Sequence, residues 1–193
     1  SRGLGDVYKR QHLEKIVQYN VQSSEKEKFD GVMLDIEPYI SDSWKENPEE
    51  YMDRYISCMK KGYKFAQKNH LRTAICIPRH YDNQGLTSGL EELIKETCDE
   101  VAVMNYSCGN EIEAIRTEAA LSEKYGKELH CILEFQEVGK HGLTENKTYR
   151  NKGIDNAKET WEKLQKEYKN INVTRDYHWS RPVREMLEEK NAD

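Results

Sequence analysis

Two carboxylates stand two residues apart at the end of one short apolar segment. Residues 31–38 read GVMLDIEP, so Asp35 and Glu37 interrupt a run of apolar side chains. If this segment is a strand, its side chains alternate, and both carboxylates share one face about 6.5–7 Å apart. Burying two like charges is costly, so one carboxyl is expected to keep its proton, as a general acid must near neutral pH. The alternative is a structural carboxylate paired with Arg79 or a lysine.

Polar and aromatic side chains also follow the next apolar segment. Residues 71–78 read LRTAICIP, and Arg79, His80 and Tyr81 come directly after them. We expect Arg79 and Tyr81 to contact the substrate, by hydrogen bonding and by ring stacking. His80 could ligate a metal, but no second His or Cys stands at a suitable spacing, so no metal site is predicted.

A site formed by these residues requires a fold in which the ends of several strands lie close together. Short apolar runs alternate with longer amphipathic stretches, a pattern typical of βαβ units on a parallel sheet in an α/β fold. Strands are predicted near residues 31–38, 71–78, 101–106, 129–135 and 171–179. Helices are predicted at residues 12–21, 110–126 and 154–168, and from residues 47, 88 and 182. The pattern fits either an open doubly wound sheet or the last five strands of an eight-stranded barrel. No glycine-rich phosphate loop follows a strand, which disfavours a dinucleotide-binding sheet.

Two of the helix starts carry capping signals. Asn47 followed by Pro48 predicts an N-cap and a first helical residue. Ser88 followed three residues later by Glu91 predicts a capping box at the next helix. Both signals would satisfy backbone N–H groups that a helix start leaves unpaired.

The carboxylate segment resembles a known family. Asp30-Gly31-x-x-x-Asp35-x-Glu37 resembles the D-G-x-D-x-D-x-E strand of the family 18 glycoside hydrolases, the chitinase-like TIM barrels. The sequence is also similar to bacterial barrel proteins of unassigned activity that carry a hydrophobic-D-x-E-P strand. The resemblance implies the last five βα units of a TIM (β/α)₈ barrel. It also implies an enzyme of carbohydrate metabolism that hydrolyses O-glycosyl bonds in an N-acetylhexosamine-containing or related glycan.

Two further segments resemble the same family. Met104-Asn105-Tyr106 is similar to the family's M-x-Y strand, and it lies two strands after the carboxylate segment. Trp179, at the end of the last predicted strand, is similar to the tryptophan under the scissile sugar. The resemblance implies a catalytic role for Tyr106 and substrate contacts for Asn105 and Trp179.

The resemblance also implies roles for the carboxylates. Glu37 would protonate the glycosidic oxygen, and Asp35 would orient the N-acetyl group whose carbonyl attacks the anomeric carbon. Tyr106 would hold that carbonyl. The family's middle aspartate is Met33 in this chain, so the relay behind Asp35 is incomplete. A non-catalytic glycan-binding or scaffold barrel is therefore the alternative.

Glu134 suggests a second hydrolytic mechanism. It lies in the predicted strand LHCILEF, which would be the seventh strand of a barrel if Glu37 is on the fourth. Retaining glycosidases of one large barrel clan place an acid and a nucleophilic glutamate on those strands, with carboxyls about 5–5.5 Å apart. That clan has Asn before the acid, where this chain has Ile36. We expect Glu134 to contact substrate, with nucleophilic attack or a merely structural carboxylate as alternatives.

Composition limits the classes of partner. The chain has 193 residues, of which 36% are hydrophobic and 34% charged, and its net charge is −5. This charge argues against a nucleic-acid partner, and no stretch approaches the ~20 apolar residues of a membrane span. The five cysteines lack C-x-x-C spacing and are expected to be free thiols. The family resemblance implies a carbohydrate ligand. We expect no cofactor, and we predict neither the oligomeric state nor the localisation.

The first eleven residues form a separate case. SRGLGDVYKRQ looks like the translation of a transposase adapter used in sequencing libraries. We therefore predict that residues 1–11 are not native and that residues 12–193 form the C-terminal part of a single barrel domain. A whole barrel takes about 250 residues, so about three βα units would precede this chain.

Overall fold

The computed structural model describes residues 4–192, and the side chains of residues 11–189. Helix α1 (Leu4–Gln22) includes most of the segment predicted to be adapter-derived. Residues 1–3 of that segment lie outside the described residues, as do the side chains up to residue 10. The non-native origin of residues 1–11 therefore stays a prediction.

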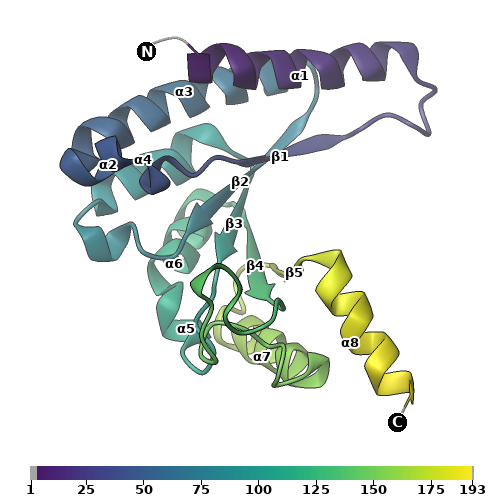
Figure 1. Cartoon of the computed structure of the whole chain (residues 1–193). Helices are drawn as coiled ribbons and strands as arrows, with labels where there is room; N and C mark the ends of the chain where they lie inside the picture. The colour runs from purple at the N-terminus through teal and green to yellow at the C-terminus, as the bar shows by residue number, and fades with distance from the viewer. Residues whose placement is uncertain (1–3, 193) are drawn as a thin grey trace.

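A single five-stranded sheet forms the centre of the molecule (Figure 1). Its strands follow one another in chain order, and every neighbouring pair is parallel. They are β1 (Gly31–Asp35), β2 (Arg72–Pro78), β3 (Glu100–Met104), β4 (Glu128–Glu134) and β5 (Val173–His178). The predicted α/β class and its parallel strands are confirmed.

Helices fill most of the connections between the strands. After α1 they are α2 (Asp42–Glu46), α3 (Pro48–Lys68), α4 (Thr87–Thr97), α5 (Glu111–Ala114), α6 (Arg116–Tyr125), α7 (Ile154–Glu167) and α8 (Ser180–Ala192). Three single 3₁₀ turns are η1 (Pro38–Ile40), η2 (Asp82–Gln84) and η3 (Lys140–Gly142). The one helix predicted over residues 110–126 is two helices, α5 and α6, which meet at Ile115. The short α2 lay outside the sequence-based prediction.

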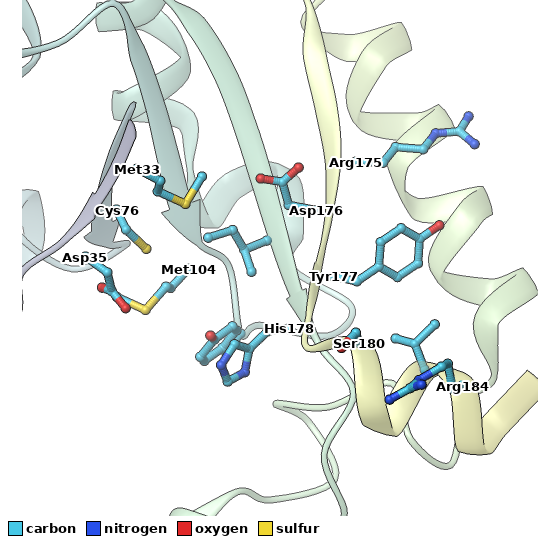
Figure 2. A pocket seen from close by; sticks show the side chains of 13 residues that line it. Met33, Asp35, Cys76, Met104, Arg175, Asp176, Tyr177, His178, Ser180 and Arg184 are labelled. Carbon is cyan, nitrogen blue, oxygen red and sulfur yellow. The ribbon is translucent and has the colours of Figure 1, made fainter. Parts of the chain in front are cut away.

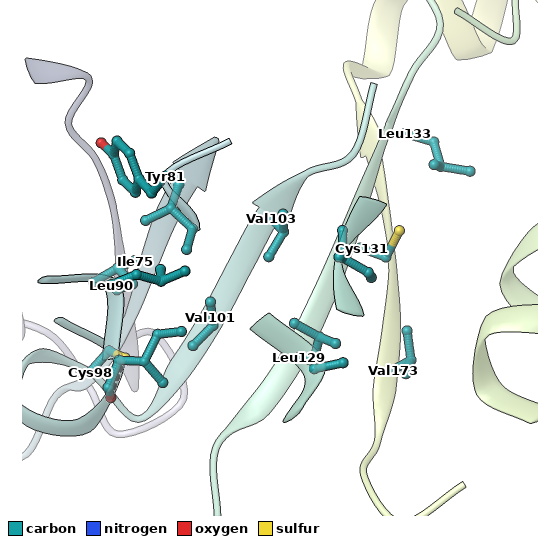
Figure 3. Packing of buried hydrophobic residues seen from close by; sticks show 14 of the residues in the cluster. Ile75, Tyr81, Leu90, Cys98, Val101, Val103, Leu129, Cys131, Leu133 and Val173 are labelled. Atoms are coloured by element: carbon teal, nitrogen blue, oxygen red, sulfur yellow. Dashed lines mark hydrogen bonds between the residues drawn. The ribbon is translucent and has the colours of Figure 1, made fainter. Parts of the chain in front are cut away.

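One face of the sheet is buried under helices. Val101 and Val103 of β3 and Leu129 of β4 point into the main core, where Leu90 of α4 meets them (Figure 3). Helix α3 contacts β2, α6 contacts β3 and β4, and α7 contacts β5. Right-handed crossovers that always step to the next strand in one direction keep their helices on one face. A doubly wound sheet reverses its strand order at a switch point. The order of β1 to β5 has no such reversal, so this five-stranded sheet is not doubly wound.

The opposite face of the sheet is more open. It carries a small apolar cluster of Cys76, Ala102 and Ile132, with Met104 and Tyr106 beside it. Cys76 is one of five free thiols, as the sequence predicts. Within the part of the chain that the structure describes, the edge strands β1 and β5 each pair on one side only. This face is where polar side chains from several strands can meet.

The two capping predictions have different outcomes. Asn47 caps α3, since its Oδ1 accepts from the Glu50 backbone N–H at 3.5 Å and its Nδ2 donates to Glu50 Oε2 at 2.9 Å. The capping box is wrong: α4 begins at Thr87, after Leu86, and no side chain caps it. Glu91 instead accepts a hydrogen bond from Lys124 at 2.6 Å, across the contact between α4 and α6. The Glu91 carboxylate therefore forms an ion pair between two helices and is not part of a capping box.

Asn47→Ala is expected to lower the free energy of unfolding by about 1 kcal/mol, because it removes the cap of a long helix. Ser88→Ala is the matched control, since Ser88 is exposed and lies inside α4. It should change stability by less than about 0.5 kcal/mol. Urea unfolding of both variants measures the difference, and equal effects would contradict the structural assignment.

Candidate active site

The carboxyl ends of the strands meet at one edge of the open face. Parallel strands present these ends together, which is where α/β folds place their sites. Register sets Asp35 of β1 beside Cys76 of β2, and Glu134 of β4 beside His178 of β5. Residues far apart in the chain thus become neighbours here.

A cavity of about 640 Å³ lies on this open face (Figure 2). Side chains from all five strands and from α8 line it. They are Met33, Asp35, Cys76, Met104, Tyr106, Ile132, Arg175, Asp176, Tyr177, His178, Ser180, Val183 and Arg184. Asp35 and Tyr106, two of the three predicted catalytic residues, are therefore brought together.

Asp35 lies at the β1 side of the cavity. The Asp35 side chain is exposed rather than buried as predicted. Partial desolvation raises the pKa of its carboxyl, and the nearby charge of Glu37 raises it further, against a hydrogen bond from the Cys76 thiol. Among the described side chains no Arg or Lys pairs with Asp35 or Glu37, so the purely structural salt-bridge alternative has no support. A carboxyl with a raised pKa beside a second carboxylate suits proton transfer.

Glu37 does not share a strand face with Asp35, so that part of the prediction is wrong. Strand β1 ends at Asp35, and Glu37 (φ −108°, ψ 73°) directly precedes the 3₁₀ turn that Pro38 begins. Pro38 lacks a backbone N–H and favours the first position of a helical turn, which ends the ladder. The Tyr39 hydroxyl donates to Glu37 Oε1 and fixes its carboxylate. Glu37 is half-buried beside the cavity and does not line it.

Glu134 is buried beneath His178, with only 2% of its surface exposed. Its Oε1 accepts from the backbone N–H groups of Phe135 and Gln136, both at 2.8 Å. Its Oε2 accepts from His178 Nδ1 at 2.8 Å and from the Gln136 side chain at 3.2 Å. Burial raises the pKa of this carboxyl, but the hydrogen bonds from His178 and Gln136 outweigh burial and hold it below 4.5. Glu134 is therefore an anion that orients His178.

His178 lines the cavity, and the sequence analysis does not identify it as a candidate site residue. The hydrogen bond to Glu134 raises the pKa of its imidazole, and the charges of Glu134, Asp35 and Glu37 add to this against burial. The Tyr106 ring lies over it, with ring centroids 5.9 Å apart and planes 32° from parallel. Burial also raises the pKa of the Tyr106 hydroxyl, which therefore stays protonated and able to donate.

The other predicted substrate contacts lie elsewhere. Tyr81 is fully buried and its ring packs against Trp44, with centroids 5.5 Å apart. Asn105 is 1% exposed and donates to the Glu111 carbonyl oxygen at 3.0 Å. Both side chains belong to the core and support the loops after β2 and β3. They have no access to a ligand in this conformation.

Arg79 and Trp179 are accessible but do not line the 640 Å³ cavity. Arg79 is half-buried after β2, and its charge adds to burial in lowering the pKa of His80. Trp179 is 45% exposed and lines a separate hollow of about 180 Å³ with Arg150 and Arg181. The Trp179 predicted beneath a sugar is thus placed beside the main cavity rather than in it.

A group of possible metal ligands lies toward the amino ends of the strands. Glu100, Glu128 and His130 offer ligand atoms that lie within 4.8 Å of one another. Arg72 already bonds Glu100 at 2.6 Å and Glu128 at 3.1 Å. His130 bonds Glu100 at 2.8 Å and Asp176 at 3.0 Å. We interpret the group as an ion-pair network, because the Arg72 guanidinium already supplies the positive charge that a metal ion would bring.

The Glu134–His178 pair makes stability depend on pH in a defined window. The pKa of His178 is raised, so its contribution is complete below about pH 6.5 and is lost as the pH rises through the folded-state pKa. The pKa of Glu134 is lowered, so its contribution is complete above pH 4.5 and is lost as the pH falls through the folded-state pKa. The contribution of the charged pair is therefore complete between about pH 4.5 and pH 6.5.

Glu134→Gln is expected to lower the pKa of His178, because a neutral amide no longer stabilises the imidazolium. NMR titration of the histidine ring protons measures this value. Glu137→Gln is the matched control, since Glu137 pairs with Lys140 at 2.9 Å on the protein surface. A His178 pKa that is the same in wild type and Glu134→Gln would contradict the assigned pair.

The wider comparisons add no assignment to this geometry. None of the helices in the described residues is long and apolar enough to cross a membrane. No known protein family, curated protein or solved structure matches this chain.

Proposed function

We propose that this protein is a glycoside hydrolase that cleaves an N-acetylhexosamine-containing or related glycan with acid assistance. The observation that carries the proposal is the convergence of Asp35 and Tyr106 on one cavity, with Glu37 close enough to raise the pKa of Asp35. The cavity volume of about 640 Å³ falls within the range of small-molecule sites. Its combination of apolar side chains with hydroxyl and charged groups suits a sugar ring.

Each carboxyl has a distinct role in the proposed reaction. Glu37 gives its proton to the glycosidic oxygen as the bond to the anomeric carbon breaks. The carbonyl oxygen of the N-acetyl group forms a bond to that carbon in place of a protein nucleophile. Asp35 accepts the amide proton of that group, and the Tyr106 hydroxyl donates to its carbonyl oxygen. Water then attacks the anomeric carbon as its bond to the carbonyl oxygen breaks. The water gives one proton to Glu37, and Asp35 returns its proton to the amide nitrogen.

We further propose that the sheet represents the last five βα units of a (β/α)₈ barrel. Its strands follow chain order, helices α3, α6 and α7 pack against it on one face, and the candidate site lies on the other face at the carboxyl ends. Strands β1 and β5 are the edges at which further strands would pair in a closed barrel. A longer natural chain that unfolds in a single transition would support this proposal.

Two alternatives receive different support. Met33 is 49% exposed and lines the cavity at the position of the family's middle aspartate, which favours glycan binding without turnover. Nucleophilic attack by Glu134 is less favoured, because both of its carboxylate oxygens already accept hydrogen bonds. It would first have to lose His178 as a partner.

The test measures hydrolysis and binding on the same glycans. The purified protein is incubated with tetrasaccharides of N-acetylglucosamine and, as controls, of glucose, and released reducing ends are counted. Release from the N-acetylated substrate alone is expected. Binding of that substrate without release would favour the glycan-binding alternative, and absence of both would overturn the proposal.

A further inference from the structure

The cavity has two chemically different sides. Asp35 lies on the β1 side, whereas His178, Ser180 and Arg184 lie where β5 leads into α8 (Figure 2). A neutral sugar needs no cation, so the basic groups on the α8 side need a separate explanation.

Arg184 is the cation without a partner. Among residues 11–189, whose side chains are described, no hydrogen bond or ion pair to Arg184 is found. Its helix neighbour Arg181 differs, because its guanidinium bonds Glu185 at 3.0 Å and lines the separate smaller hollow. Arg175 also lines the cavity, but its guanidinium lies 3.8 Å from Glu162, and Figure 2 shows it directed away from Asp35 and His178. Arg184 is therefore available to a ligand.

His178 adds a second donor on this side. The Glu134 carboxylate only accepts, so Nδ1–H donates to it at 2.8 Å. Nε2–H is a donor when the imidazole is protonated, which the raised pKa of His178 favours. Within the described side chains no group bonds to Nε2. The ring is restrained between Glu134 below and the Tyr106 ring, which fixes the direction of this donor.

Glu134 balances the charge of His178, whereas no carboxylate among the described residues pairs with Arg184. Asp176 lines the cavity, but its Oδ2 bonds His130 Nδ1 at 3.0 Å. Glu134 is buried and already bonded four times. Asp35 lies on the opposite side, on β1. An incoming anion would therefore meet Arg184 and His178 without a competing carboxylate between them.

We propose that the cavity binds an acidic glycan, with the carboxylate of a hexuronic acid held by Arg184 and by His178 Nε2. The inference rests on the proposed function and narrows its substrate class. A guanidinium matches the two oxygens of a carboxylate, and such charge-assisted bonds are about twice as strong as neutral ones. The ring of the same sugar would lie on the apolar floor formed by Met104 and Ile132.

The test compares two glycans of equal length by calorimetry. One is a tetrasaccharide of alternating glucuronic acid and N-acetylglucosamine, and the other contains N-acetylglucosamine alone. The Glu37→Gln protein is used to avoid turnover. The acidic glycan should bind at least tenfold more tightly, and adding Arg184→Gln should remove that preference. Arg181→Gln, the matched control, should change neither affinity.

The outcomes separate this inference from the proposed function. Equal affinities for the two glycans, or equal losses in the two arginine variants, would overturn the acidic-glycan site even if wild type hydrolyses the neutral glycan. Tight binding of the acidic glycan that depends on Arg184, without cleavage by wild type, would support the site and overturn the hydrolase. Thermal unfolding checks that both arginine variants are folded.

Discussion

Glu37→Gln is expected to lower the rate of glycan hydrolysis by about 10²–10⁴-fold, the usual contribution of a general acid. Glutamine keeps the size of the side chain and can still accept a hydrogen bond from Tyr39. It has no proton to give to the glycosidic oxygen at neutral pH. Affinity for the uncleaved glycan should therefore stay within about threefold of wild type. Steady-state kinetics and calorimetry measure the two quantities separately.

Glu49→Gln is the matched control for this variant. Glu49 is exposed in the first turn of α3 and does not line the cavity. Its rate should equal that of wild type. A loss of less than tenfold in Glu37→Gln would show that another group donates the proton, and Asp35, with its raised pKa, would be the next residue to replace.

The strands could be predicted from the sequence because parallel strands covered by helices read as nearly continuous apolar runs. Residues 129–135 (LHCILEF) and 71–78 (LRTAICIP) were predicted as strands, and β4 and β2 lie there within one residue at each end. The end of β1 was placed too late, because the apolar run continues through Ile36 while Pro38 already ends the ladder. Local turn chemistry, rather than hydrophobicity, decided where Glu37 lies.

The partners within the site could not be predicted, because strand register determines them. Glu134 and His178 are 44 residues apart, and only the pairing of β4 with β5 sets them side by side. Tyr81 and Asn105 follow strand ends just as Tyr106 does, yet they turn into the core. Composition and spacing do not distinguish a loop side chain that faces a cavity from one that supports the loop.

Trp161→Ala is expected to lower the free energy of unfolding by about 3–5 kcal/mol, the usual cost of removing a buried large aromatic side chain. Trp161 of α7 is 1% exposed, and its indole N–H donates to the Cys131 carbonyl oxygen of β4 at 2.9 Å. Its ring also packs on Tyr177 of β5, with centroids 4.8 Å apart. The Trp161 side chain therefore connects α7 to both β4 and β5. The urea midpoint measures the loss.

Trp179→Ala is the matched control, because this tryptophan is 45% exposed and should cost less than about 0.5 kcal/mol. Equal losses in the two variants would contradict the packing of α7 against β4 and β5.

The loss of the Trp161 side chain should also change the electrostatics of the candidate active site. Tyr177 directly precedes His178 on β5, so loosening Tyr177 weakens the hold of Glu134 on the imidazole. The pKa of His178 should therefore fall in Trp161→Ala and stay unchanged in Trp179→Ala. This result would show that packing on the covered face of the sheet affects the electrostatics of the cavity on the open face.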